Sequence, residues 1–447
     1  MKLWRLVMKS KVQTLLFVFF TVTNLSALDL GAPLPLSLEN AQQQVLEHSP
    51  TLFRANLDLE VALRDQNAQL KSWIPGVSAS GGVRRSSPLL SALTNPASAK
   101  PETQLWSLSG SVDLRLNWNL NLSLEEKREA LVTQLARLEV QALERSLVSA
   151  LKKQYYQILG AEASIALQEE GMQLAQTRLE QIQAQFDRGL RSDLELLTAK
   201  IAASRDLPVL ERAKADQEKR FTTLRQSLGL APNSPLVLTT PLDYSRLPLP
   251  TWEETKDKIS AHIDLIRATL RHELSQINRE LGRASRLGPG LGISLGWSSG
   301  LNPLLEPKSW SAERWSDNLS LGLSLSVPLD AHWEGTTGNL ALQRLDVEVK
   351  RTQSNLEEVQ TRIPTEIQGL LLDLKVARSQ VEWGLLSLNL QEQNYRKVLE
   401  GFERGKTPLL DLENARQELQ KAKITQESNR LGVYFLFVDL TSRLGSL

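Results

Sequence analysis

The segment QAQFDRGLRSDLELLTAK, residues 183–200, returns in altered form as LEGFERGKTPLLDLENAR, residues 399–416. A constant offset aligns four pairs of residues in the two segments: Phe186 with Phe402, Arg188 with Arg404, Gly189 with Gly405, and Ala199 with Ala415. The same offset relates the Leu-Gly dipeptides at 228–229 and 444–445. The repeated unit is far longer than the roughly 20 to 50 residues of a solenoid repeat. The sequence therefore indicates the duplication of one large module.

The duplication divides the chain into two repeats, which we place at residues 28–230 and 251–447. Residues 231–250 lie between them, and their proline-rich composition is typical of an extended connector. Residues 1–27 combine a basic start, an apolar run from Thr14 to Val22 and a small-residue site at 25–27. This order predicts a secretory signal peptide. A membrane anchor is disfavoured because a spanning helix needs roughly 20 apolar residues.

The composition excludes several classes of function. The 447 residues include no cysteine and four histidines, with 52 Lys and Arg against 51 Asp and Glu. A chain without cysteine has no disulfide, iron–sulfur cluster or cysteine nucleophile, and a formal charge of +1 does not favour a nucleic-acid partner. The sequence offers no nucleophile–base constellation, so we predict a protein that is not an enzyme and needs no cofactor or metal.

Both repeats predict the same order of elements: a helix, a strand pair, a long helix, a tip turn and another helix. The strand pairs are expected at residues 76–120 and 290–329, and the tip turns near residues 189 and 405. The long helices are expected from Asn121 to Asp187 and from Leu340 to Glu403, the latter with a bend at Pro364. About 67 residues at 1.5 Å each reach roughly 100 Å. Such helices must pack as coiled coils.

The predicted strands alternate between apolar and polar residues. Leucine, valine and tryptophan occupy the even positions from 108 to 120 except for Gly110, while the odd positions carry serine, asparagine, aspartate and arginine. This pattern fits a lipid-facing and water-facing membrane strand, although a soluble sheet packed on a helix also alternates. Four strands cannot close a barrel, and open sheet edges are not tolerated in lipid. If the strands are membranous, several chains must share one barrel, and three would form a twelve-stranded one.

The ordered, duplicated set of motifs resembles the TolC-like outer-membrane efflux protein family. The motifs are the F-x-R-G turns at 186–189 and 402–405, the D-L-E triplets at 193–195 and 411–413, and the Leu-Gly ends. The resemblance covers nearly the whole chain, from Leu36 to Leu447. It implies a mainly α-helical fold with a transmembrane β-barrel portion. It further implies a homotrimer in outer-membrane lipid that extends into the periplasm as a helical tunnel.

The resemblance also implies partners and site residues. A periplasmic adaptor protein would dock on the tip turns, where we place Phe186, Arg188, Gly189, Phe402, Arg404 and Gly405 as candidates. Carboxylates just beyond the turns would form a cation-attracting ring at the closed end, for which the candidates are Asp411, Glu195, Asn414 and Asp193. Asn414 stands where the family can place an acid, and Thr407 where it can place a gate-locking arginine.

Local roles compete with these assignments. Ser192 with Glu195 fits a capping box, and Thr407 with Pro408 fits an N-cap followed by the first helical residue. Arg188 and Arg404, late in their helices, also suit the negative helix end. Asp411 has no such local role, and ringed carboxylates select cations.

The preferred hypothesis is a passive exit duct of a tripartite efflux or type I secretion system, served by an inner-membrane transporter. The alternative is a periplasmic or surface structural coiled-coil protein without channel activity. The sequence does not identify the cargo.

Overall fold

A computed structural model describes residues 34–69, 71, 74–86, 105–118, 121–241, 247–248, 250–302, 304–305 and 314–445. The predicted signal peptide lies outside these residues. The chain forms two compact units. Unit 1 comprises residues 1–50, 144–252 and 368–447, and unit 2 comprises residues 51–143 and 253–367. Two long helices, α5 (Leu122–Phe186) and α9 (Thr337–Glu403), contribute to both units.

The prediction of a mainly helical chain is confirmed. Unit 1 also contains β1 (Leu34–Leu36), α2 (Leu38–His48), α6 (Asp193–Ser227), β4 (Leu236–Leu238) and α10 (Leu409–Leu444). Unit 2 holds most of α3 (Pro50–Gln69) and of α7 (Trp252–Ile259), together with α8 (Ile263–Leu287) and the short helix η4 (Asp330–His332). Its strands are β2 (Gly76–Arg85), β3 (Trp106–Trp118), β5 (Gly290–Leu301) and β6 (Trp315–Ser326).

The first helix of each repeat is divided into two. Ser49 adopts an extended conformation between α2 and α3, because a residue before proline is disfavoured in a helix. In the second repeat, α7 ends at Ile259, and His262 begins α8 by accepting a hydrogen bond from the Asp264 backbone N–H, 3.2 Å away. By contrast, α9 is continuous through Pro364.

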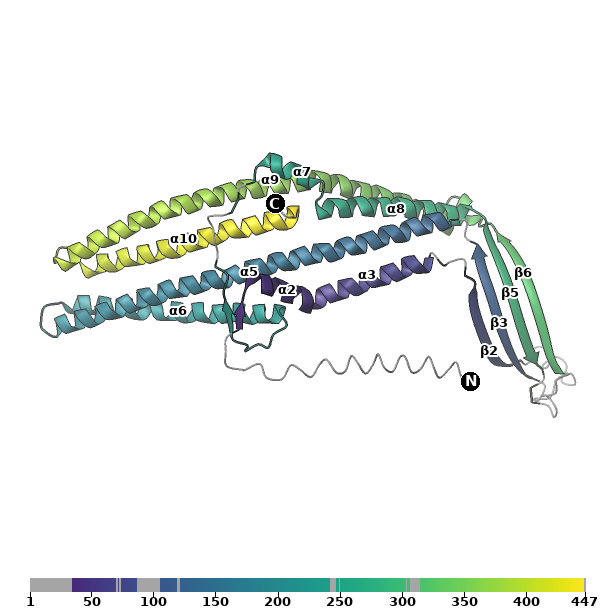
Figure 1. Ribbon diagram of the computed structural model, residues 1–447, viewed down its shortest axis with the longest axis horizontal. Coiled ribbons are helices and arrows are strands. Elements are labelled where there is room, and N and C mark those ends of the chain that lie inside the picture. The colour runs from purple at the N-terminus through teal and green to yellow at the C-terminus, as the bar shows by residue number, and fades with distance from the viewer. Residues whose placement is uncertain are drawn as a thin grey trace. The chain divides into compact units, whose positions relative to one another are not determined.

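The four long strands form one antiparallel sheet in the order β2-β3-β5-β6, so the hairpins of the two repeats join through β3 and β5 (Figure 1). The register aligns apolar residues across neighbouring strands, as where Leu114 faces Leu295 and Leu295 faces Leu321. Small and polar residues align in the same way, with Ser80 opposite Ser111. The sheet therefore has one apolar and one polar face, and β2 and β6 are its edges.

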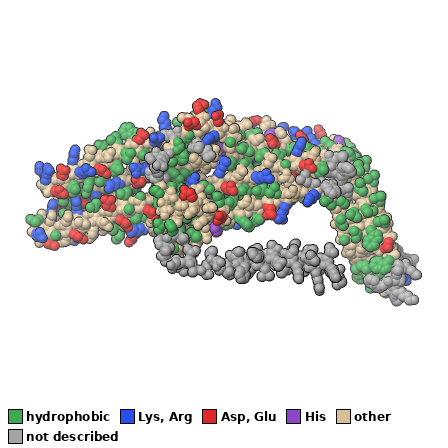
Figure 2. All heavy atoms as spheres, in the orientation of Figure 1, with side chains coloured by type: hydrophobic (Ala, Val, Ile, Leu, Met, Phe, Trp, Pro, Cys, Tyr) green, Lys and Arg blue, Asp and Glu red, His purple; other side chains and the backbone are tan. Residues whose placement is uncertain are grey.

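The apolar face of the sheet is exposed within this chain. The side chains of β6 are the clearest case, since Leu319, Leu321 and Leu323 are 70%, 78% and 77% exposed. Hydrophobic side chains gather over the strands in Figure 2. Among the described helices, none combines the length and the apolar character that crossing a membrane requires.

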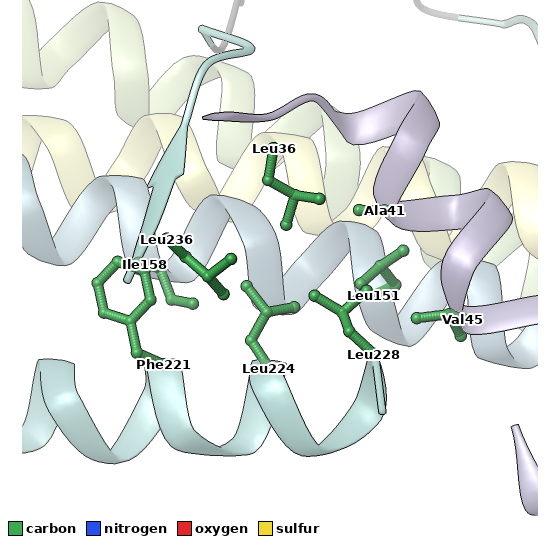
Figure 3. Packing of buried hydrophobic residues seen from close by; sticks show 9 residues of the cluster. All are labelled: Leu36, Ala41, Val45, Leu151, Ile158, Phe221, Leu224, Leu228 and Leu236. Atoms are coloured by element: carbon green, nitrogen blue, oxygen red, sulfur yellow. The ribbon is translucent and has the colours of Figure 1, made fainter. Parts of the chain in front are cut away.

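Unit 1 contains a strand pair that the sequence did not predict. Within the expected connector, β4 pairs in parallel with β1, and Leu34 lies opposite Leu236. The buried Tyr155 hydroxyl donates to the Leu36 carbonyl at 2.8 Å and accepts from the Thr240 backbone N–H at 2.9 Å. Leucines from both strands enter a core with α2, α5 and α6 (Figure 3). The connector is thus partly a packed structural element.

Candidate functional site at the tip turns

The two tip turns have the same backbone structure. The first tip turn, residues 187–192, follows α5, and the second tip turn, residues 404–408, follows α9. In the first, the Gly189 N–H donates to the Phe186 carbonyl at 2.8 Å and the Leu190 N–H to the Gln185 carbonyl at 2.9 Å. In the second, Gly405 donates to Phe402 at 2.9 Å and Lys406 to Gly401 at 2.8 Å. Both patterns are Schellman motifs, which satisfy the last carbonyls of a helix.

The glycines in these motifs are required by backbone conformation. Gly189 and Gly405 have φ angles of 74° and 73°, in the left-handed region that other residues enter only at a cost. An added Cβ would meet no atom within 4 Å at either position. Glycine is therefore required at these positions by the positive φ angle and not by lack of space for a side chain.

The tip turns share a hydrophobic core in unit 1. Phe186 and Phe402 are partly buried and pack on the same cluster, which also contains Ile182, Leu196 and Leu409. The predicted docking aromatics are therefore positioned by packing, and each ring helps to attach one turn to the other.

Two arginines that the sequence analysis did not identify lie over Phe402. The guanidinium carbons of Arg178 and Arg191 are 5.5 and 4.8 Å from the ring centre. Arg191 also donates to the Gln185 side chain at 2.8 Å and to Glu195 Oε1 at 2.7 Å. Cation–π contacts of this kind attract by about 0.5–2 kcal/mol. They depend on residues far apart in the sequence, so no local pattern could have predicted them.

Glu195 forms the capping box that its spacing predicted. Its Oε2 atom accepts from the Ser192 backbone N–H at 2.9 Å, while the Ser192 hydroxyl accepts from the Glu195 backbone N–H at 3.3 Å. The Ser192 backbone hydrogen bond and the neighbouring Arg191 lower the pKa of Glu195, although partial burial opposes the shift. The Glu195 carboxylate is thus held by its own turn and largely compensated by Arg191.

The other gate candidates are exposed. Asp193 lies in the first turn of α6 and Asp411 in the first turn of α10, where the helix dipole favours a negative charge. Asn414 is exposed one turn after Asp411. The structure therefore leaves Asp193, Asp411 and Asn414 accessible to solvent, in contrast to Glu195.

The expected cap of α10 was wrong. Pro408 itself is the N-cap residue, with an extended backbone and no side-chain capping bond, so the helix begins at Leu409. Thr407 instead lies over the end of α9: an added Cβ at Gly401 would be 2.3 Å from its Oγ1 atom. A proline side chain has no acceptor for the backbone N–H groups that a cap must satisfy.

Arg188 and Arg404 are exposed on the tip turns. The guanidinium of Arg404 lies 3.9 Å from the Glu400 carboxylate, and both of these side chains are more than half exposed. Such a surface pair contributes little to stability. Both arginines are accessible to a partner surface.

The sequence analysis also did not identify a buried ion network around Arg416, which lies shortly after the gate candidates on α10. The Arg416 side chain is 6% exposed and donates to Glu413 at 2.9 Å, to Asp206 at 3.0 Å and to the Gly171 carbonyl at 2.9 Å. It thereby joins α10 to α6 and α5. Burial lowers the pKa of Arg416, but the hydrogen bonds to Asp206 and Glu413 outweigh burial and raise it overall. The E-x-x-R spacing favours an ion pair between Glu413 and Arg416 on the same helix. The burial of this pair, in contrast, depends on the helices packed around it.

The comparison with protein families identifies the class of the protein. The sequence profile described as "Outer membrane efflux protein" matches residues 41–230 and 258–446. The chain belongs to the outer membrane efflux protein family. It is accordingly an outer-membrane transport protein, as the motif resemblance indicated.

This efflux protein is similar to the outer membrane protein TolC of Vibrio cholerae, with 20% identity over 427 residues that cover 92% of this chain and 91% of that protein. Its fold matches the CmeC outer membrane channel of Campylobacter jejuni with a TM-score of 0.76, covering 91% and 85% of the two chains at 14% identity. It also matches the outer membrane protein VceC of Vibrio cholerae with a TM-score of 0.71, covering 92% and 96% at 14% identity. These structures support the fold of the efflux protein.

Proposed function

We propose that three copies of the chain form an outer-membrane channel whose tip turns close the periplasmic end. The channel passively conducts substrates delivered by an inner-membrane transporter and a periplasmic adaptor protein, in a tripartite efflux or type I secretion system. It performs no chemical reaction.

The observation that carries this proposal is the sheet of unit 2. Its apolar face is exposed, and among the described residues β2 and β6 each pair with another strand on one side only. Lipid accommodates the apolar face but not unpaired strand edges. Pairing β6 of one copy with β2 of the next satisfies both edges, and twelve strands leave room for a water-filled interior.

The tip turns supply the gate and the docking surface of the proposed channel. Asp411 is the favoured pore charge because its carboxylate is exposed, whereas Glu195 is bound by Ser192 and Arg191. Asp193 and Asn414 are secondary candidates for the same ring. Arg188 and Arg404, exposed beside the paired glycine turns, are proposed to contact the adaptor.

Conductance of the purified protein in planar lipid bilayers tests the proposal. The wild-type protein should insert as a trimer and conduct ions. Asp411→Ala should raise the single-channel conductance or weaken block by multivalent cations, because ringed carboxylates attract cations. Glu211→Ala, an exposed acid on α6 away from the turns, is the matched control and should behave as wild type. Unchanged conductance and block in Asp411→Ala would remove Asp411 from the gate.

The oligomeric state separates the channel from the structural coiled-coil alternative. Light scattering should find three chains per particle in detergent. A single chain that stays in solution without detergent and does not conduct would contradict the channel. Cross-linking in cells, followed by purification, should capture an adaptor and an inner-membrane transporter together, and Arg404→Glu should reduce the adaptor yield.

A further inference from the structure

A cavity of about 430 Å³ lies within unit 1, between α2, α5 and the C-terminal end of α10. Its apolar lining comes from Leu46, Val148 and Val438, one residue from each helix. Three hydroxyl-bearing residues, Ser149, Thr441 and Ser442, also line the cavity. The volume falls within the roughly 300–1,000 Å³ of small-molecule pockets. The mixture of apolar and polar lining resembles a site for an amphipathic ligand.

Two cationic side chains, Arg145 and Lys152, line this cavity from positions about two turns apart on α5. Neither forms an ion pair with any described residue, although the adjacent Lys153 is paired with Asp439. The Nη1 atom of Arg145 is buried and has no hydrogen-bond partner in the described part of the chain. Leaving a buried donor unsatisfied is unfavourable. The Arg145 guanidinium therefore has hydrogen-bonding capacity that no described residue uses.

Negative groups around the cavity limit the charge that it can accept. Glu144 also lines it, and the C-terminal end of α10 carries a partial negative charge. Arg145 lies at that helix end, since an added Cβ on Gly445 would be 3.8 Å from its guanidinium nitrogens. Two cations against one carboxylate and a partial charge leave less than one net positive charge. This balance favours a single negative charge over two.

We propose that this cavity binds a monoanionic organic molecule with an apolar body, of the carboxylate or sulfonate class. The anionic group is held by Arg145 and Lys152 with hydroxyl support from Ser149, and the apolar body lies against Leu46, Val148 and Val438. The site lies apart from the tip turns and does not depend on the proposed channel function.

Titration calorimetry of the purified protein in a nonionic detergent tests the proposal with three matched probes. Benzenesulfonate carries one negative charge, phenyl phosphate about two near pH 8, and benzyl alcohol none. Benzenesulfonate should bind saturably with one molecule per chain, phenyl phosphate at least about fivefold more weakly, and benzyl alcohol without saturation. Absence of benzenesulfonate binding at millimolar concentration would overturn the site, and tighter binding of phenyl phosphate would overturn its preference for one charge.

Variants then locate the bound probe. Arg145→Gln should weaken benzenesulfonate binding about tenfold or more, as expected for loss of a charged hydrogen bond, and Lys152→Gln should weaken it less. Arg137→Gln, at an exposed arginine earlier on the same helix, should leave affinity unchanged. Val148→Phe reduces the cavity without altering charge and should abolish binding, which keeps the test decisive if Arg145→Gln does not fold. Full affinity in Arg145→Gln or in Val148→Phe would place the ligand elsewhere.

Discussion

The Arg191 guanidinium carbon lies 4.8 Å from the centre of the Phe402 ring and thereby joins the two tip turns of one chain. Arg191 belongs to the first turn, whereas Phe402 lies in the last turn of α9. The same guanidinium donates to Glu195, a gate candidate. One side chain therefore couples the capping carboxylate of the first repeat to the aromatic anchor of the second, and a change at Arg191 should affect both turns.

Arg191→Gln should loosen the second tip turn. Loss of the cation–π contact removes about 1 kcal/mol, which corresponds to roughly fivefold faster amide hydrogen exchange through local opening at residues 402–408. Exchange measured by mass spectrometry checks this. Arg188→Gln, at an exposed arginine of the same turn, is the control. Equal exchange rates in the two variants would show that the ring contact does not hold the turns together.

Glu195→Gln should reduce stability near neutral pH and matter less in acid. The folded-state pKa of Glu195 lies below its ordinary value of 4.5. Its contribution to stability is therefore fully present above the ordinary value and is lost as the pH falls through the lowered one. Glutamine can still accept from the Ser192 backbone N–H, but loss of the negative charge beside Arg191 and the N-terminus of α6 should cost about 0.3–1 kcal/mol at pH 7. Thermal unfolding of both proteins from neutral pH downward should show melting temperatures that converge, and a constant difference would refute the assignment.

Arg416→Met should be strongly destabilising. It leaves Glu413 buried without its partner, a change that typically costs 3–5 kcal/mol. The double variant Arg416→Met with Glu413→Leu removes the more buried of the two carboxylates that lose Arg416, leaves Asp206, and should recover part of this loss. Arg212→Met, at an arginine whose side chain is 86% exposed, should change stability little. Thermal unfolding compares all three, and a double variant no more stable than Arg416→Met would argue against an uncompensated Glu413 as the cause.

Gly405→Ala should destabilise the second tip turn by about 1–2 kcal/mol, because alanine tolerates the left-handed conformation poorly. Gly432→Ala is a close control: it lies inside α10, has no neighbour within 4 Å of an added Cβ and has no positive φ. Helix propensity predicts that this second change stabilises the protein by up to about 1 kcal/mol. Opposite shifts in melting temperature are expected, and shifts of the same sign would contradict the conformational argument.

Features that act over a few residues followed from the sequence. The structure contains the alternating strands, the long helices α5 and α9, the latter beginning at Thr337 rather than Leu340, and the Ser192–Glu195 capping box. Each depends on backbone propensity or on side chains within one helical turn. The interacting residues are therefore close together in the sequence and can be recognised from it. The wrong cap at Thr407 shows the limit of this reasoning, because a proline can lie on either side of a helix start.

Pairings between distant segments were decided only by the tertiary structure. The joining of β3 to β5, the pairing of β1 with β4 inside an expected connector, and the placement of Arg191 over Phe402 all connect residues more than 150 positions apart. The same holds for Asp206 with Arg416, whose charges lie inside a helix interface rather than on a solvated face. Whether a charged side chain is buried, and which residue it pairs with, depends on which helices pack together when the chain folds. The local sequence around each residue does not predict these long-range contacts. The duplicated turns did predict that two similar helical hairpins would form.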